Sequence, residues 1–280
     1  MNKIQAFESI AQDVARGAVE FSTDARVTLR LRDALSDPDC HVEAAAKLVQ
    51  AEPLLAARIV AMANSVAYNP YAREISDLRS AIARLGFATL RSLTMALITR
   101  QMAGASIPVA HRGVAEQLWE HTAHVAALSR VLARRVTMVD AEAALFAGLV
   151  HEVPGFYLLS RSAHYPGLLD EGFADWIETG EQMVGQPLLA ALNIPENIRI
   201  AIEAGWEGYL GMPPSTLGDT LLLAEELSPV PSPLHSLDQG GGKPARSDAE
   251  IELMIGEVLL TEILAESRDE VASLSAALRF

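Results

Sequence analysis

Apolar residues recur every three or four positions along most of the chain, which is the spacing of one face of an α-helix. Residues 26–35 place Val27, Leu31 and Ala34 on one such face. The same spacing recurs in the stretches 42–49, 53–62, 75–85 and 87–97. No stretch shows several convincing strands with alternating polar and apolar residues. The pattern therefore predicts an all-α protein.

Turn-forming residues separate these helical stretches. Pro38 disfavours a helical conformation of the residue before it, Asn69-Pro70 predicts a loop, and Gly86 predicts a helix end. Asn64, at the end of the third stretch, has two interpretations. The first is a helix C-cap in the left-handed conformation, and the second is a polar contact at the end of a buried helix, for example between the two halves of the protein; the two are compatible.

The second half of the chain is also helical in pattern. We predict helices over 116–136, from Asp140 to about Glu152, and over 178–192, 195–205 and 215–227. Pro154-Gly155 is expected to end the second of these. Residues 228–247 contain four prolines and three consecutive glycines, which predicts a flexible loop. A helical segment then runs over residues 248–280.

The charge of the chain is acidic and unevenly distributed. Among 280 residues, half are hydrophobic and the formal net charge is −14. Residues 1–100 carry +1, residues 101–227 carry −10 and residues 228–280 carry −5. This excess argues against binding to nucleic acid or to an anionic membrane, because both require a positive field. A basic protein surface would be attracted, whereas the alternative is an acidic surface that aids solubility.

The single cysteine and the N-terminal residues limit the class of protein further. Cys40 alone allows no intramolecular disulfide and no CxxC metal site, and its neighbour His41 is poorly placed to activate it. Residues 1–8 lack the apolar core of a signal peptide. The longest apolar runs are far shorter than a membrane span. We therefore expect a cytoplasmic protein.

Several motifs resemble those of the HDOD domain, a bacterial, all-helical signalling domain related to the HD metal-dependent phosphohydrolases. They are Leu35-Ser36-Asp37-Pro38-Asp39, the stretch 48–55, Ala63-Asn64-Ser65, and the residues from Ile75 to Gly86. Leu118-Trp119-Glu120-His121 and Ala147-Gly148-Leu149-Val150-His151 resemble the second half of the domain. The resemblance implies a two-lobed fold. We divide the chain into a first lobe (1–108), a degenerate HD-like second lobe (109–227), the loop 228–247 and a helical segment (248–280) that packs on the second lobe.

The same resemblance identifies the candidate metal ligands. His121 stands at the first histidine position of the HD signature, His151-Glu152 stands in place of His-Asp, and Glu225 lies near the last carboxylate. Two imidazoles and two carboxylates could hold a divalent metal. The extra methylene of Glu relative to Asp argues against correct geometry. A further family histidine is replaced by Glu181, and a later His-His pair falls on Gly205-Trp206.

Each histidine also has an ordinary structural interpretation. His121 shares the apolar face of its helix with Leu118 and Val125, as a hydrogen-bonded core residue would. His151 lies at the end of a predicted helix, where a histidine interacts favourably with the negative end of the helix dipole. His235 lies in a predicted loop without ligand spacing. We therefore expect no functional metal site and no cofactor.

The function predicted from the resemblance is regulatory. We expect a non-catalytic HDOD-type module of bacterial signal transduction that acts through contact with another protein. The acidic second lobe would favour a partner with a basic surface. One alternative is a metal-dependent phosphohydrolase that uses His121, His151, Glu152 and Glu225. Another is a nucleotide-sensing domain that binds without hydrolysis.

Overall fold

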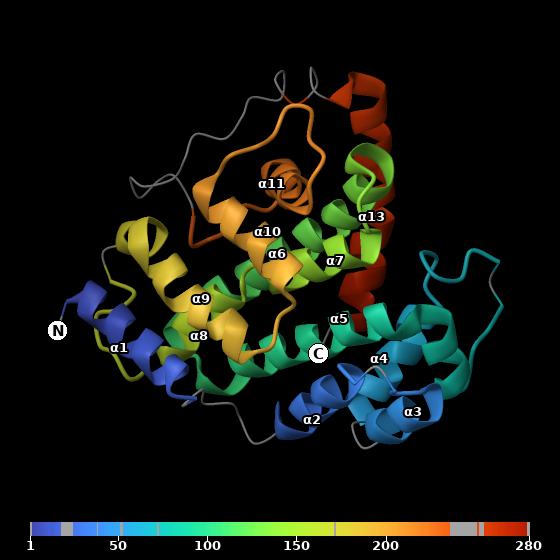
Figure 1. Cartoon of the computed structure of the whole chain (residues 1–280), viewed down its shortest axis with the longest axis horizontal. Helices are drawn as coiled ribbons and strands as arrows, with labels where there is room; N and C mark the ends of the chain where they lie inside the picture. Colours follow the sequence, from blue (N-terminus) through green and yellow to red (C-terminus); the bar gives the residue numbers. More distant parts are fainter. Residues whose placement is uncertain are drawn as a thin grey trace.

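The computed structural model describes residues 2–17, 25–37, 39–50, 53–71, 73–170, 172–235, 251 and 255–278. Throughout these residues the regular structure is helical and contains no strand, which confirms the predicted all-α class. Figure 1 shows the helices gathered around the long helix α5 and the helix pair α6 and α7. Residues 236–247, the second part of the predicted flexible loop, lie outside the described residues.

The first lobe consists of four helices in which three shorter helices pack on a long one. The bounds are α2 (Ala25–Leu35), α3 (Val42–Gln50), α4 (Pro53–Ala63) and α5 (Leu78–Ser106). Asp77 caps α5 by accepting a hydrogen bond from the amide of Ser80. Gly86, with φ 76° and ψ 168°, interrupts α5 as a kink. A residue with a side chain rarely adopts this conformation, so the predicted helix end at Gly86 is confirmed.

The loop between α4 and α5 is held by Asn64. Its side-chain amide donates to the carbonyls of Val60 and Ile75, and its side-chain oxygen accepts from the amide of Ile75. Asn64 does not adopt the left-handed conformation. Its role is therefore a polar contact at the end of α4, as one of the two interpretations expected, and the side chain ties this helix end to the returning chain of the same lobe.

The second lobe begins with a closely packed pair of antiparallel helices. They are α6 (Arg112–Leu132), preceded by a short 3-10 turn (Val109–His111) and continued by a π-helical turn (Ala133–Thr137), and α7 (Ala141–Val150). Asp140 caps α7 as predicted, accepting from the amides of Glu142 and Ala143. At Gly148, an added Cβ would lie 2.5 Å from the Cα atom of Ala126, so only glycine permits this approach of the two helices.

The remaining helices of this lobe surround the pair. They are α8 (Val153–Arg161), a π-helical turn (Trp176–Gly180) leading into α9 (Glu181–Ala191), α10 (Glu196–Glu207) and α11 (Leu217–Leu227). Pro154 does not simply end a helix, as the sequence analysis expected. It occupies the first turn of α8, where the missing amide hydrogen costs nothing, so a second helix starts directly after α7.

The N-terminal helix α1 (Lys3–Ala15) packs on the second lobe, although the sequence division placed it with the first. Phe7 meets Trp176 edge to face, with ring centroids 5.6 Å apart. Ser9 forms a hydrogen bond with Tyr165, and the ammonium group of Lys3 donates to the backbone carbonyl of Gly172. Helix α1 therefore lies beside α9 in Figure 1.

The C-terminal helix α13 (Glu257–Leu278) contacts α6 of the second lobe and α4 of the first. Its acidic residues Glu262, Glu266 and Glu270, which are four positions apart, form ion pairs with arginines at the end of α6. Ile263 and Leu274 of the same helix are buried. The helix therefore connects the two lobes in addition to packing on the second.

Two helical stretches, 78–99 and 141–161, are long and apolar enough to cross a membrane by length and composition alone. In the most apolar part of the two stretches, 67% and 89% respectively is buried inside the protein. Such burial is typical of the core helices of a soluble protein.

Candidate functional site

A cluster of histidines and glutamates lies where α6, α7, α8 and α11 meet. His121 comes from the middle of α6, His151 directly follows α7, Glu152 precedes α8, and Glu225 lies near the end of α11. The structure thus brings together all four residues that the resemblance identified. His121 and Glu152 are each only 1% exposed.

Glu225 joins the two imidazole rings. Its Oε2 lies 3.1 Å from Nε2 of His121, and its Oε1 lies 2.9 Å from Nε2 of His151. The two Nε2 atoms are 3.3 Å apart. Glu225 therefore reaches both rings from α11, and its longer side chain does not prevent convergence.

The other nitrogen of each ring faces a backbone carbonyl. Nδ1 of His121 lies 2.7 Å from the carbonyl of Val230, and Nδ1 of His151 lies 2.8 Å from that of Gly148. A carbonyl oxygen can only accept, so Nδ1 of each ring carries the hydrogen. In a neutral ring this leaves the Nε2 lone pair directed into the cluster, which is the arrangement of histidines that bind metals.

Glu152 faces the same ring nitrogen of His121 as Glu225 does. Its Oε1 is 3.8 Å from Nε2 of His121 and accepts a hydrogen bond of 2.6 Å from the hydroxyl of Ser232. The second oxygen, Oε2, is buried without a hydrogen-bond partner among the described residues. A buried carboxylate oxygen left in this way is costly, and a cation would satisfy it.

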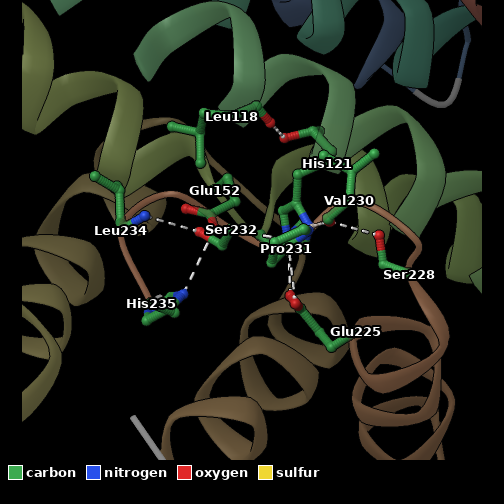
Figure 2. A network of polar contacts seen from close by, with 12 residues as sticks. Leu118, His121, Glu152, Glu225, Ser228, Val230, Pro231, Ser232, Leu234 and His235 are labelled. Carbon is green, nitrogen blue, oxygen red and sulfur yellow. Dashed lines mark hydrogen bonds and ion pairs between the residues drawn. The ribbon is translucent and has the colours of Figure 1, made fainter. Parts of the chain in front are cut away.

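Residues 228–235, which we call the strap, cover the cluster (Figure 2). His235 lies on the strap, in the predicted loop, and its contacts with glutamates of the site could not be predicted from its position in the sequence. Its Nε2 is 2.9 Å from Oε2 of Glu181, and its Nδ1 is 3.7 Å from Oε1 of Glu152. Periodicity gave no signal for this contact, because the strap is not helical and proline occupies three of its positions.

The carboxylates change the protonation of the buried histidines. Burial disfavours the charged form of His121, but Glu225 and Glu152 outweigh it and raise its pKa to about 9. Burial likewise opposes charge on His235, while Glu181 and Glu152 raise its pKa to about 10. Burial would raise the pKa of Glu225, yet His151 and His121 hold it well below its ordinary value. Without a metal, the cluster is thus held by charge-assisted hydrogen bonds.

The donor set fits a divalent metal ion. One donor atom from each of His121, His151 and Glu152 lies within 4.8 Å of the others, and Glu225 adds a carboxylate to both rings. Imidazole nitrogens combined with carboxylate oxygens suit ions such as Zn²⁺, Mn²⁺ and Fe²⁺. These residues therefore fit a metal better than the sequence analysis expected.

Lysine and arginine side chains are absent from the described contacts of the cluster. Its described polar partners are histidine, glutamate, serine and backbone carbonyl groups. Arg161, the basic residue that the sequence left unplaced, lies in the last turn of α8, at the far end of that helix from Glu152. Cys40 lies between α2 and α3, where burial and the charge of Asp37 raise the pKa of its thiol, so it is not an activated nucleophile.

The all-helical fold, with His121 on α6, His151 directly after α7 and carboxylates beside them, agrees with the HD-related class that the sequence motifs resemble. More narrowly, the chain belongs to the HDOD family, because the HDOD domain matches residues 22–206. No curated protein matches the sequence.

Solved structures show the same fold. A protein from Shewanella amazonensis SB2B, named "Putative metal-dependent phosphohydrolase", superposes with a TM-score of 0.71 at 18% identity and covers 99% of both chains. An HDOD domain protein of unknown function from Geobacter sulfurreducens gives a TM-score of 0.66 at 21% identity, over 99% of this chain and 100% of the other. At these identities the similarity establishes the fold alone.

Proposed function

We propose that the protein is a non-catalytic regulatory module of bacterial signal transduction, located in the cytoplasm, that acts by binding another protein. The observation that carries this proposal is the closure of the histidine cluster by the strap. Ser232 and Leu234 of the strap are 4% and 0% exposed, and the side chains of Ser232 and His235 contact glutamates of the site. A phosphorylated substrate would have to displace this segment.

The charge of the site supports the same proposal. Glu152, Glu181 and Glu225 surround the histidines, and the described polar contacts of the cluster include no lysine or arginine. Phosphoryl transfer requires positive groups that stabilise the charge on the phosphoryl oxygens. The carboxylates instead favour cations and repel a phosphate group.

Hydrolysis assays test the absence of catalysis. The purified chain is incubated with bis-p-nitrophenyl phosphate and with cyclic dinucleotides, each in the presence of Mn²⁺. We expect no turnover above that of the His151→Ala variant. Turnover in the wild type that this variant loses would overturn the proposal.

The partner surface is expected on the acidic second lobe. The outer side of α10 exposes Glu196 and Glu207, with Glu203 partly exposed between them on the same helix. A basic protein surface would be attracted to these carboxylates. We expect a partner captured from native cells by the wild type to be lost by the Glu203→Lys/Glu207→Lys variant. The matched Asp33→Lys/Asp39→Lys variant of the first lobe should retain it. Equal capture by both variants would exclude α10 as the contact surface.

A second candidate function is metal-dependent phosphohydrolysis, favoured by the convergence of the four donors. His121, His151, Glu152 and Glu225 would hold the ion, and a bound divalent ion would supply Lewis-acid chemistry to a phosphoryl group or water. The residues of the chain would bind and orient the ion, while the strap would have to move to admit substrate. Stoichiometric metal in the purified protein together with metal-dependent turnover, both lost in His151→Ala, would favour this candidate.

A further inference from the structure

The strap contacts the side chains of the cluster through specific polar groups. The carbonyl of Val230 accepts from His121, and the hydroxyl of Ser232 donates to Glu152. The hydroxyl of Ser228 donates to the same Val230 carbonyl at 2.8 Å, which fixes the position of that carbonyl. Figure 2 shows these contacts following one another along the strap.

Apolar packing also holds the strap in place. Leu234 is fully buried and lies against Gly155 at the start of α8. A Cβ atom on Gly155 would come within 2.5 Å of the Leu234 side chain. The strap also lies beyond residue 206, where the match to the family domain ends.

Two polar contacts from the strap act on candidate metal ligands of the cluster. The Val230 carbonyl keeps the hydrogen of His121 on Nδ1 and leaves Nε2 for a ligand. Ser232 holds one oxygen of Glu152, while the other oxygen has no described partner. Outer groups that orient metal ligands in this way increase the affinity of a site for its ion.

We infer that the strap positions His121 and Glu152 for a divalent cation, so that closure of the strap and occupation of the cluster stabilise each other. The inference concerns binding of the cation only and is independent of whether the protein hydrolyses any substrate. Ser232 is the positioning residue whose side chain can be removed. The coupling is reciprocal, because a cation that binds the closed form more tightly must also favour that form.

Calorimetry with Mn²⁺ and with Zn²⁺ tests the first half of this coupling. We expect the wild type to bind one equivalent of at least one of these ions, and Ser232→Ala to bind it about 10- to 100-fold more weakly. Ser232→Thr keeps a hydroxyl and should recover most of the affinity. Ser160→Ala is the matched control, since Ser160 is also buried but donates only to the carbonyl of Tyr157.

Hydrogen exchange tests the reciprocal half. The non-proline amides of residues 230–235 should exchange more slowly when the ion is present. This added protection should disappear in His121→Gln, which cannot offer the same nitrogen to the ion. Thermal unfolding of each variant without metal shows whether the fold is retained, so that a loss of affinity is not confused with a loss of folding.

Three results would overturn the inference. They are the absence of Mn²⁺ and Zn²⁺ binding by the wild type, equal affinity in Ser232→Ala and Ser160→Ala, and tighter binding in Ser232→Ala. The last result would make the strap a competitor of the cation. None of them bears on the hydrolysis assay, which tests the proposed function separately.

Discussion

Arg130 provides the sharpest test of how the parts of the protein are joined. Its guanidinium lies 2.7 Å from Glu142 of α7 and 2.9 Å from Glu270 of α13, and it stacks 4.3 Å from the ring centroid of Tyr68. Glu142 also accepts a hydrogen bond of 2.7 Å from Thr89 of α5. One side chain of the second lobe therefore contacts the first lobe and the C-terminal helix together.

The expected cost of removing Arg130 follows from its burial. Its side chain is 8% exposed and that of Glu270 is 9% exposed, so Arg130→Ala would remove one of the two arginines that pair with this buried carboxylate, the other being Arg134, and would also remove the partner of Glu142. Breaking a buried ion pair from one side costs about 3–5 kcal/mol. Arg135 is the matched control, because it pairs with Glu262 and Glu266 while its own side chain is 38% exposed. Exposed pairs of this kind contribute about 0–1 kcal/mol.

Thermal unfolding followed by circular dichroism measures both variants. At roughly 2–4 °C per kcal/mol for a chain of this size, Arg130→Ala should lower Tm by on the order of 10 °C. Arg135→Ala should lower it by no more than about 4 °C. Arg130→Lys should fall between them, because an ammonium group cannot reach both carboxylates with the fork of a guanidinium. Equal losses in Arg130→Ala and Arg135→Ala would refute the argument that burial makes this contact strong.

Three further predictions concern packing and one loop. Gly148→Ala should destabilise the protein by about 1–3 kcal/mol in chemical denaturation, because the added methyl group overpacks against α6. In the control Gly205→Ala, no atom lies within 4 Å of the added Cβ, so this change should stabilise α10 by up to about 1 kcal/mol. Phe7→Ala should cost about 3–5 kcal/mol because Phe7 is 1% exposed, and an unchanged Tm would mean that α1 is not docked. Asp219 accepts hydrogen bonds from the amides of residues 211, 215 and 216. Burial opposes the charge of Asp219, but these bonds outweigh it and lower its pKa. The contribution of Asp219 to the stability of the fold should therefore be complete above about pH 4 and be lost as the pH falls through the folded-state pKa. Asp219→Asn should remove this part of the acid dependence of Tm, and an identical pH profile would contradict it.

Local signals in the sequence predicted the helices well. Apolar spacing located α2 to α4, Gly86 marked the kink in α5, and Asp140 marked the start of α7. Each of these signals depends on residues close in the chain, so the sequence carries them directly. The interpretation of Pro154 failed for a related reason. Proline ends a helix that comes before it and is also well suited to the first turn of a new helix, and the pattern alone did not distinguish these two roles.

The composition of the site could be predicted only in part. The resemblance located His121, His151, Glu152 and Glu225, and they do converge. The strap was not predicted to contact them, because 109 residues separate His121 from the Val230 carbonyl and the strap has no periodic pattern. The position of Glu225 beside both rings could not be predicted either, since the packing of α11 determines it.

The placement of charge shows what a composition can and cannot predict. Residues 101–227 and 228–280 carry formal charges of −10 and −5, which suggested a broad acidic surface. In the structure, the α13 carboxylates pair with arginines of α6 and its π-helical turn, and the site carboxylates pair with histidines. Much of the excess therefore stabilises the fold and the cluster rather than facing a partner. A carboxylate already bound to an arginine attracts a second cation weakly, so a basic partner should select the exposed glutamates of α10 over the acidic stripe of α13.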